Sequence, residues 1–237
     1  DPTTLHLLMA EMQFNVVHSL YPMTLGDAAY LAAIRLQMEL PIDAEKDDVL
    51  ATDGCEIPFM FEEKISKKQW AKDVYAAYTR LTLTNETDPT KLYLEYGRQW
   101  SWYGAVFFQG SIEQEATKYL WRERPDEHVR VGVNINGIHI INDRKNTIKL
   151  SLPFSEFQYN AFTSEDDGDS LVIQYDAKAA PDTLPEKQRK KLTPTELSLL
   201  QVTMVVWTQQ ATMIETLVNR YIDEEQHYSQ LLSDKQS

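Results

Sequence analysis

The chain has 237 residues and a formal net charge of −13, enough length for one large or two ordinary domains. Its acidic balance, shared by both halves of the sequence, argues against a nucleic-acid-binding protein and against broad adhesion to anionic lipid. No apolar run in the sequence approaches the ~20 residues that span a bilayer. The one cysteine, Cys55, excludes an intrachain disulfide and fits a reducing compartment.

Residues 3–103 are predicted to form helices, because apolar side chains recur there at three- and four-residue intervals. The first apolar stripe comprises Leu5, Leu8, Met9, Met12, Val16 and Leu20. Thr24 is expected to cap a second helix, with Asp27 at the third helical position. Ser66 and Asp88 are N-cap candidates for two later helices.

The character of the chain changes at Tyr103-Gly104, after which apolar and polar residues alternate in short runs typical of strands. Asn136-Gly137 is a strong signal for a two-residue hairpin turn. The proline-containing segment 177–198 is expected to be a loop insertion. The pattern predicts strands at 105–112, 129–135, 138–141, 148–152, 157–162, 171–175 and 200–207.

After the last strand the period becomes helical, which predicts a long terminal helix over 208–231 with Thr208 as its N-cap. Its apolar stripe must pack on the strands that precede it. Antiparallel strands plus one such helix predict a two-sheet sandwich whose open end the helix plugs. The expected fold is therefore α+β, with helices over 1–103 and a seven-stranded sandwich with a C-terminal helix over 104–237. The stripe consists of Ala211, Ile214, Leu217, Val218, Tyr221 and Ile222.

Four motifs, taken in order, resemble those of a known family. They are Tyr21-Pro22 ahead of Ala28-Ala29-Tyr30-Leu31-Ala32-Ala33, Tyr103-Gly104-Ala105-Val106-Phe107-Phe108, Val131-Gly132-Val133-Asn134-Ile135-Asn136-Gly137-Ile138-His139, and Gln209-Gln210-Ala211 ahead of Leu217 and Tyr221. They resemble the second and third lobes of a FERM domain, in the subgroup of the Krev-interaction-trapped protein and FERM domain-containing protein 8. The resemblance covers nearly the whole chain. It implies an acyl-CoA-binding-protein-like helical lobe over 1–103 and a PH/PTB-like lobe over 104–237. It also implies that a ubiquitin-like first lobe precedes residue 1, so that this chain is a fragment.

The residues that carry most enzyme chemistry do not occur in the expected patterns. None of the five histidines has a second histidine or cysteine at metal-ligand spacing. The acidic segment 165–169 lacks the alternating ligands and closing glutamate of an EF-hand loop, so a solvated turn is expected. The sequence contains neither a glycine-rich phosphate loop nor a serine nucleophile elbow. We therefore expect a protein without catalytic residues, a bound metal or a cofactor.

The fifth predicted strand, 157–162, is the candidate binding element, because an unpaired sheet edge is a template for another strand. If the terminal helix lies along that edge, an extended peptide can add as a strand between them. The resemblance implies that third lobes of this kind bind receptor tails in this way. The candidate contacts are Gln158, Asn160 and Phe162 on the strand and Met213, Leu217 and Arg220 on the helix. Phe157, Tyr159 and Ala161 are expected to point inward. The competing interpretation, that the 177–198 loop or the first lobe covers this edge, remains open.

These observations favour a non-catalytic adaptor that binds the cytoplasmic tail of a membrane protein at the inner membrane face. Such a protein is expected in the cytoplasm, at the periphery of the plasma membrane or the cell cortex. The resemblance adds a Rap-type small GTPase as a partner of the intact protein. The alternative is a cargo-binding tail module of an unconventional myosin or another cytoskeletal motor. Binding of nucleic acid is not expected, and binding of phosphoinositides is expected to be weak or absent.

The sequence contains one run of basic residues, 187–191, and its contact with a membrane can be tested. Each basic residue near an anionic surface contributes about 1 kcal/mol, but a solvated loop tip is the simpler interpretation in a chain with net charge −13. We predict weak co-sedimentation with anionic liposomes at physiological salt, abolished when the four basic residues are changed to glutamine. Binding that survives these substitutions would contradict the prediction. The four residues are Lys187, Arg189, Lys190 and Lys191.

Overall fold

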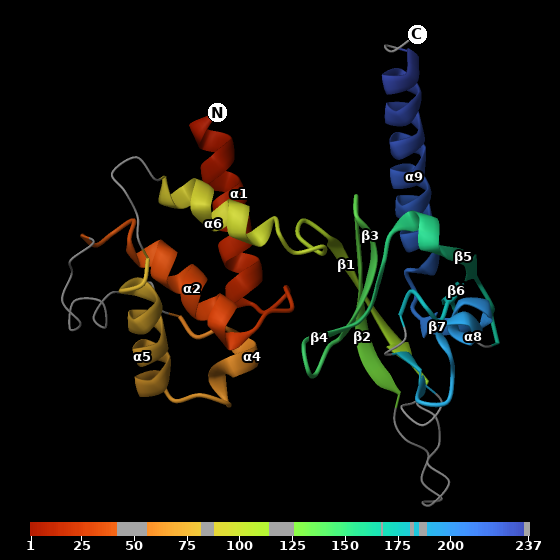
Figure 1. Cartoon of the computed structure of the whole chain (residues 1–237), viewed down its shortest axis with the longest axis horizontal. Helices are drawn as coiled ribbons and strands as arrows, with labels where there is room; N and C mark the ends of the chain where they lie inside the picture. The colour runs from red at the N-terminus through yellow and green to blue at the C-terminus, as the bar shows by residue number, and fades with distance from the viewer. Residues whose placement is uncertain are drawn as a thin grey trace, which may run out of the picture. The chain divides into compact units, whose positions relative to one another are not determined.

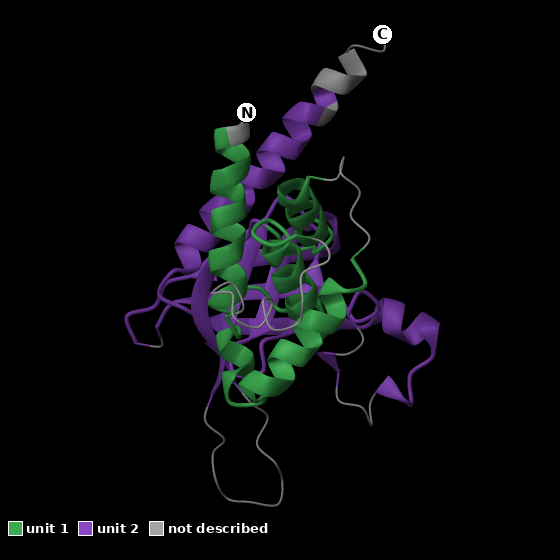
Figure 2. Cartoon of the chain, turned by 90° about the vertical axis from the view of Figure 1, so that its left-hand side faces the viewer, with its two compact units in different colours: residues 1–103 green, residues 104–237 purple. Residues whose placement is uncertain are grey.

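The computed structural model describes residues 1–41, 56–81, 88–113, 126–166, 168–180, 183–184 and 189–234. The chain divides into two compact units, Asp1–Tyr103 and Gly104–Ser237 (Figure 2). The described part of the first unit is helical, and the second is built on strands (Figure 1). No helix in the part that the structure describes has the length and apolar character needed to cross a membrane. Cys55 and Lys187 lie outside the described residues.

The caps predicted from the sequence begin three helices of the first unit. Thr24 and Asp27 form a reciprocal capping box at the start of the second helix. Ser66 and Asp88 each accept a hydrogen bond from a backbone N–H of the first turn that follows. The helices described in this unit are α1 (Pro2–Val17), α2 (Leu25–Leu36), α4 (Phe59–Glu62), α5 (Lys67–Tyr78) and α6 (Pro89–Gly97).

The helices of the first unit pack through their apolar faces, with α2 in contact with both α5 and α6, and α1 in contact with α6. Asp27 also connects α2 to α6, because it accepts a hydrogen bond from the Tyr96 hydroxyl at 2.6 Å. Burial alone would raise the pKa of Asp27, but the hydrogen bonds from Tyr96 and Thr24 lower it below its usual value. The core side chains include Met12, Leu31, Ile34, Trp70, Val74, Tyr78 and Leu94.

The second unit contains a seven-stranded antiparallel sheet in the order β4-β3-β2-β1-β7-β6-β5. The sheet has two halves, β1 to β4 and β5 to β7, and among the described residues they pair only at Ser111–Trp207, between β1 and β7. The other neighbouring strands pair over five or more positions. The strands are β1 (Val106–Ile112), β2 (Glu127–Asn134), β3 (Gly137–Asn142), β4 (Thr147–Leu152), β5 (Phe157–Phe162), β6 (Ser170–Asp176) and β7 (Gln201–Trp207).

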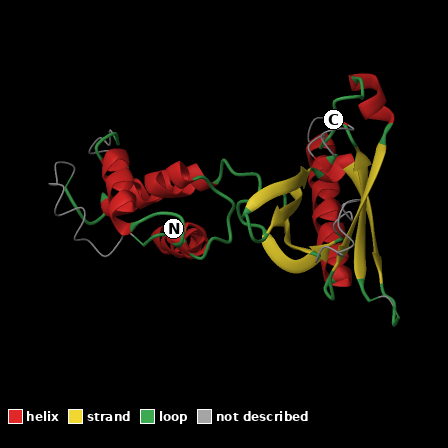
Figure 3. Ribbon diagram, turned by 90° about the horizontal axis from the view of Figure 1, so that it is seen from below, coloured by secondary structure: helices red, strands yellow, loops and turns green. Residues whose placement is uncertain are grey.

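The terminal helix α9 (Ala211–Asp234) lies between the two halves of the sheet (Figure 3). It contacts β2 on one side and β5 and β6 on the other. Ala211, Ile214 and Val218 are buried in one core cluster with side chains from both halves, such as Val131 and Ile173. This arrangement confirms the predicted α+β fold and the PH-like sandwich plugged by a helix.

Thr208 fixes the start of α9 to the sheet. Its hydroxyl donates a hydrogen bond to the carbonyl of Gln109 in β1 at 2.6 Å and accepts one from the Gln210 N–H at 3.2 Å. The Thr208 N–H donates to the carbonyl of Asp169. Toward the other end of the helix, residues 223–228 and 230 are exposed, and Figure 1 shows the C-terminal end of α9 continuing past the strands.

Two details predicted from the sequence are wrong. The segment 177–198 is not only a loop, because α8 (Pro194–Leu199) begins within it. This helix is too short to produce a visible apolar period, but Thr193 and Glu196 form a capping box that marks its start. The β2–β3 turn lies one residue earlier than predicted, at Ile135-Asn136, where the side chain of Asn134 accepts a hydrogen bond from the Asn136 N–H.

Gly137 has φ +130° as it enters β3, and a Cβ atom there would lie 1.9 Å from the carbonyl oxygen of Leu152. We predict that Gly137→Ala lowers the free energy of unfolding by at least about 2 kcal/mol, because it adds backbone strain and a clash with β4. Denaturant unfolding of the whole chain measures the effect. Gly168→Ala is the control: it has φ +82° but open space around the Cβ position, so only about 1 kcal/mol should be lost. Equal losses in the two variants would contradict the role of the β4 contact.

Candidate functional site

Strand β5 forms one end of the sheet. It pairs with β6 throughout its length, and no strand among the described residues pairs with its other side. In an antiparallel pair, alternate residues turn their backbone N–H and C=O groups away from the partner strand. Ala161 is one of these, because its N–H bonds to a side chain of α9. The backbone groups of Phe157 and Tyr159 therefore also point away from β6.

The two faces of β5 differ in burial as the alternation predicts. Phe157 belongs to the core cluster, and Tyr159 and Ala161 pack against that cluster. The expectation that these three side chains point inward is confirmed. The opposite face is exposed to solvent and carries the three strand residues predicted for the site, Gln158, Asn160 and Phe162.

Two hydrogen bonds join the free edge of β5 to one flank of α9. The Ala161 N–H donates to Glu215 Oε1 at 3.0 Å, and the Tyr159 hydroxyl donates to Asn219 Oδ1 at 2.7 Å. Burial raises the pKa of Tyr159, and the negative charges of Glu215 and Asp223 raise it further. The flank of α9 that follows β5 is therefore polar and acidic.

The helix residues predicted for the site lie elsewhere. Met213 is 61% exposed, Leu217 packs on the core, and Arg220 is 75% exposed with its guanidinium 3.0 Å from Glu224. Successive helix residues are rotated by about 100°, so Met213 and Arg220 lie far around the helix from Glu215. The predicted spacing does describe one flank of α9, but it is the flank turned away from β5. The facing flank carries Glu215 and Asn219, four residues apart on the border of the apolar stripe, but the sequence gives no signal that separates this border from the opposite one.

The described residues of the basic run, 189–191, do not form a pocket for an anionic ligand. Arg189 is half-buried and Lys190 and Lys191 are exposed, while Lys187 lies outside the described residues. The acidic segment 165–169 is a turn at residues 165 and 166, and residue 167 also lies outside the described part. Within the residues that the structure describes, no group of three or more histidine, cysteine, aspartate or glutamate side chains is arranged to hold a metal ion.

One trio resembles a nucleophile with its base. His139 Nδ1 lies 2.9 Å from Ser151 Oγ, and its Nε2 lies 3.1 Å from Asn134 Oδ1. Because the amide oxygen of Asn134 accepts from Nε2–H, the neutral ring accepts the Ser151 proton at Nδ1. However, the ring is 1% exposed and burial lowers its pKa to about 4, whereas a general base works best with a pKa near the operating pH. The trio connects β2, β3 and β4, and it is not placed to act on a substrate.

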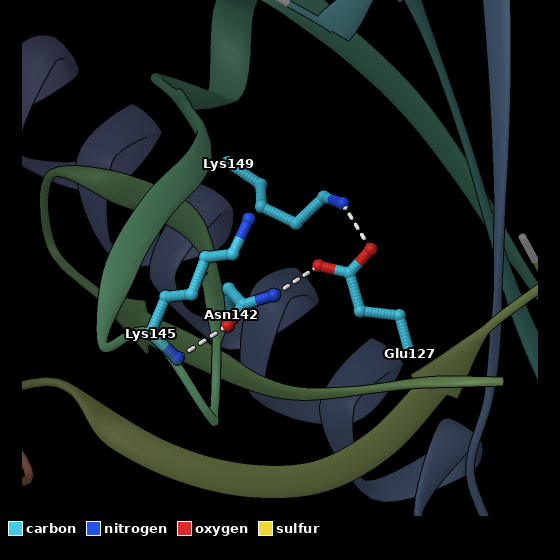
Figure 4. Close-up of polar contacts among 4 residues, drawn as sticks. All are labelled: Glu127, Asn142, Lys145 and Lys149. Atoms are coloured by element: carbon cyan, nitrogen blue, oxygen red, sulfur yellow. Dashed lines mark hydrogen bonds and ion pairs between the residues drawn. The ribbon is translucent and has the colours of Figure 1, made fainter. Parts of the chain in front are cut away.

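A second polar cluster lies where β2, β3 and β4 come together (Figure 4). Glu127 accepts hydrogen bonds from Lys149 Nζ at 2.6 Å and from the side-chain amide of Asn142. Burial alone would raise the pKa of Glu127, but these bonds and the charges of Lys149 and Lys145 lower it. The lysine charges are thus partly neutralised within the cluster, which stabilises the β3–β4 hairpin rather than forming an open anion site.

Comparisons with known proteins agree with this architecture. A family model of the FERM central domain matches residues 1–108, and a model of the KRIT1/FRMD8 FERM domain C-lobe matches residues 127–217. The chain therefore belongs to the FERM family, as the motifs indicated. Its C-lobe is of the KRIT1/FRMD8 type. FERM domains are in general non-catalytic protein-interaction modules found at membrane peripheries and the cytoskeleton.

Curated relatives share low identity with the chain. FERM domain-containing protein 8 of Xenopus laevis is 23% identical over 199 residues, which is 74% of this chain and 44% of the relative. FERM domain-containing protein B of Dictyostelium discoideum is 27% identical over 142 residues, which is 59% of this chain and 30% of the relative. The chain therefore spans less than half the length of these relatives.

Solved structures share the fold. The human Myosin 7b C-terminal MyTH4-FERM domain, in complex with the harmonin-a PDZ3 domain, superposes with a TM-score of 0.55 at 12% identity. That match covers 91% of this chain and 38% of the myosin chain. The Drosophila Merlin FERM domain, in complex with its C-terminal domain, has a TM-score of 0.51 at 14% identity and covers 97% and 67% of the two chains. At this identity the likeness concerns the fold alone.

The bond between Glu215 and the Ala161 N–H makes a prediction for the free protein. Glu215→Ala removes the acceptor, so the Ala161 amide should exchange with solvent about tenfold faster. Glu215→Gln keeps an acceptor oxygen and should change the exchange little. Glu224→Ala removes the same charge from the far flank and serves as the control. Hydrogen exchange measured residue by residue by NMR decides the matter, and equal rates in all four proteins would contradict the contact.

Proposed function

We propose that this chain is the tail-binding part of a non-catalytic adaptor at the inner face of a membrane. It would bind the cytoplasmic tail of a membrane protein as an extended strand on the free edge of β5, beside α9. The observation that carries the proposal is the Ala161 N–H, which points away from β6 toward a position where a further strand would pair. We also propose the lobe boundary between residues 103 and 104, where one compact unit ends and the other begins along the sequence.

Strand addition suits this edge for a physical reason. The outward backbone groups of Phe157, Tyr159 and Ala161 repeat every second residue, so they set the register of an added strand. Each backbone hydrogen bond contributes only about 0.5–1.5 kcal/mol net. Main-chain pairing along so short a strand therefore gives modest affinity, and side chains that flank the edge must supply specificity.

The edge is not empty in the free chain. Glu215 already accepts a hydrogen bond from the Ala161 N–H, and Asn219 accepts one from the Tyr159 hydroxyl. An added strand must replace Glu215 at Ala161 with a carbonyl oxygen of its own. Both side chains lie on a helix flank, so they can leave by changing rotamer while the apolar stripe of α9 stays in the core.

The adaptor is favoured over the motor tail by the sequence relatives. Curated matches are FERM domain-containing proteins, whereas the likeness to myosin structures is limited to the fold. A Rap-type small GTPase is proposed as a further partner of the intact protein, on the basis of the KRIT1/FRMD8 type of the C-lobe. The inner membrane face is proposed on the same family basis.

Replacing Ala161 tests the docking edge. Ala161→Pro removes the outward N–H, and because that N–H does not pair with β6, the ladder inside the sheet should remain. Peptides from the cytoplasmic tails of membrane proteins would be screened on an array, and those that bind would be titrated by calorimetry. Ala161→Pro should weaken binding at least about tenfold.

Met213→Ala is the control for this experiment. Its side chain is exposed on the flank of α9 turned away from β5, so tail binding should not change. Tails that bind Ala161→Pro as tightly as the wild-type chain would contradict docking on β5. Tails that depend on Met213 instead would restore the site predicted from the sequence.

A further inference from the structure

We propose that the tail taken by this edge is basic, and that it carries two arginine or lysine residues four positions apart that pair with Glu215 and Asp223. This inference rests on the proposed function, because it names the chemistry of the strand that docks on β5. It follows from the way in which α9 and β5 run alongside each other.

Residues of β5 and α9 that face each other recur at nearly equal distances along the strand and along the helix. Ala161 bonds to Glu215 and Tyr159 bonds to Asn219, so two residues back along β5 correspond to four residues forward along α9. Two strand residues span about 6.6 Å, and four helix residues span about 6 Å. The next step in this series places Asp223 at the level of Phe157. Electrostatic coupling of Tyr159 to both Glu215 and Asp223 agrees with this register.

An added strand therefore meets a carboxylate at each end of its paired segment. Glu215 and Asp223 are eight residues apart on the helix, which is about 12 Å. Four strand residues cover about 13 Å, and residues four apart point to the same side of a strand. Two side chains of one tail, at positions i and i+4, are thus able to reach both carboxylates.

Displacement of Glu215 makes a positive charge the fitting partner. In the free chain its carboxylate accepts from the Ala161 N–H at 3.0 Å. When the carbonyl of a docking strand takes that N–H, the half-buried carboxylate needs another donor. An arginine or lysine supplies one, a neutral tail leaves the carboxylate without it, and an acidic tail adds repulsion.

Arg220 is the one arginine or lysine among the described residues of α9. It lines a pocket together with Asn219 and Asp223, but its guanidinium is paired with Glu224, 3.0 Å away. The net charge of −13 also raises the rate at which cationic partners approach. Local and global charge therefore favour the same class of tail.

A random peptide library tests the inference, because it offers tails of every charge on equal terms. Phage-displayed peptides of about 12 residues, long enough to cover the edge, would be selected on the wild-type chain, with the Ala161→Pro chain used to remove peptides that bind elsewhere. The selected peptides should be enriched in pairs of basic residues at i and i+4. Synthetic copies should bind less tightly as salt increases.

Glu215→Gln is the decisive variant, because it keeps the oxygen that accepts from Ala161 and removes only the charge. It should weaken the selected peptides about fivefold. Glu224→Gln changes the net charge equally on the far flank and should have no effect. Selected peptides that are neutral or acidic, or that bind Glu215→Gln as tightly as the wild type, would overturn the basic tail. If those same peptides still require Ala161, docking on β5 stands; if no peptide depends on Ala161, the proposed function fails as well.

Discussion

Burial of the apolar stripe of α9 between the two halves of the sheet is the constraint on which the C-lobe depends. In the part of the chain that the structure describes, the halves share only the strand pair Ser111–Trp207, so the helix completes the core that joins them. Because Ala211, Ile214 and Val218 are fixed in that core, the rotation of the helix about its own axis is fixed too. That rotation, and not any feature of β5, determines that Glu215 and Asn219 face the free edge.

If a strand docks on β5 as proposed, the Glu215–Ala161 contact serves stability and recognition in opposite ways. An unpaired edge strand tends to pair with strands of other molecules, and charged side chains are a common protection. Glu215 covers the Ala161 N–H of β5 in this way, so the free protein is guarded against unspecific pairing of edges. A specific partner must bring a group that satisfies the displaced carboxylate. Under the proposed docking, this protective contact would also select between partners, because unsuitable strands would leave the half-buried carboxylate of Glu215 without a hydrogen-bond donor.

Much of this fold follows from local patterns in the sequence, because alternation and helical period report which faces are buried. They placed the strands to within a few residues, and Thr24, Ser66 and Asp88 marked helix starts correctly. The flank of α9 that meets β5 was not predictable, since an apolar stripe has two borders and the period treats them alike. Helix α8 escaped because a single turn and a half shows no period, although its capping box was visible. The β2–β3 turn lies one residue before the predicted Asn136-Gly137 pair. The hydrogen bond from the Asn136 N–H to the side chain of Asn134 stabilises the turn at this earlier position.

The anchor at Thr208 has a mechanical consequence. Its hydrogen bonds with Gln109, Gln210 and Asp169 fix the N-terminal end of α9, whereas residues 223–228 and 230, toward the other end, are exposed. Because α9 is held at its N-terminal end, the residues nearest that end move least when the helix tilts. Any tilt of the helix therefore displaces Asp223 further than Glu215, and the gap along β5 widens first beside Phe157. A docking strand would therefore form its first backbone hydrogen bonds beside Phe157. It would then pair residue by residue along β5 toward Ala161.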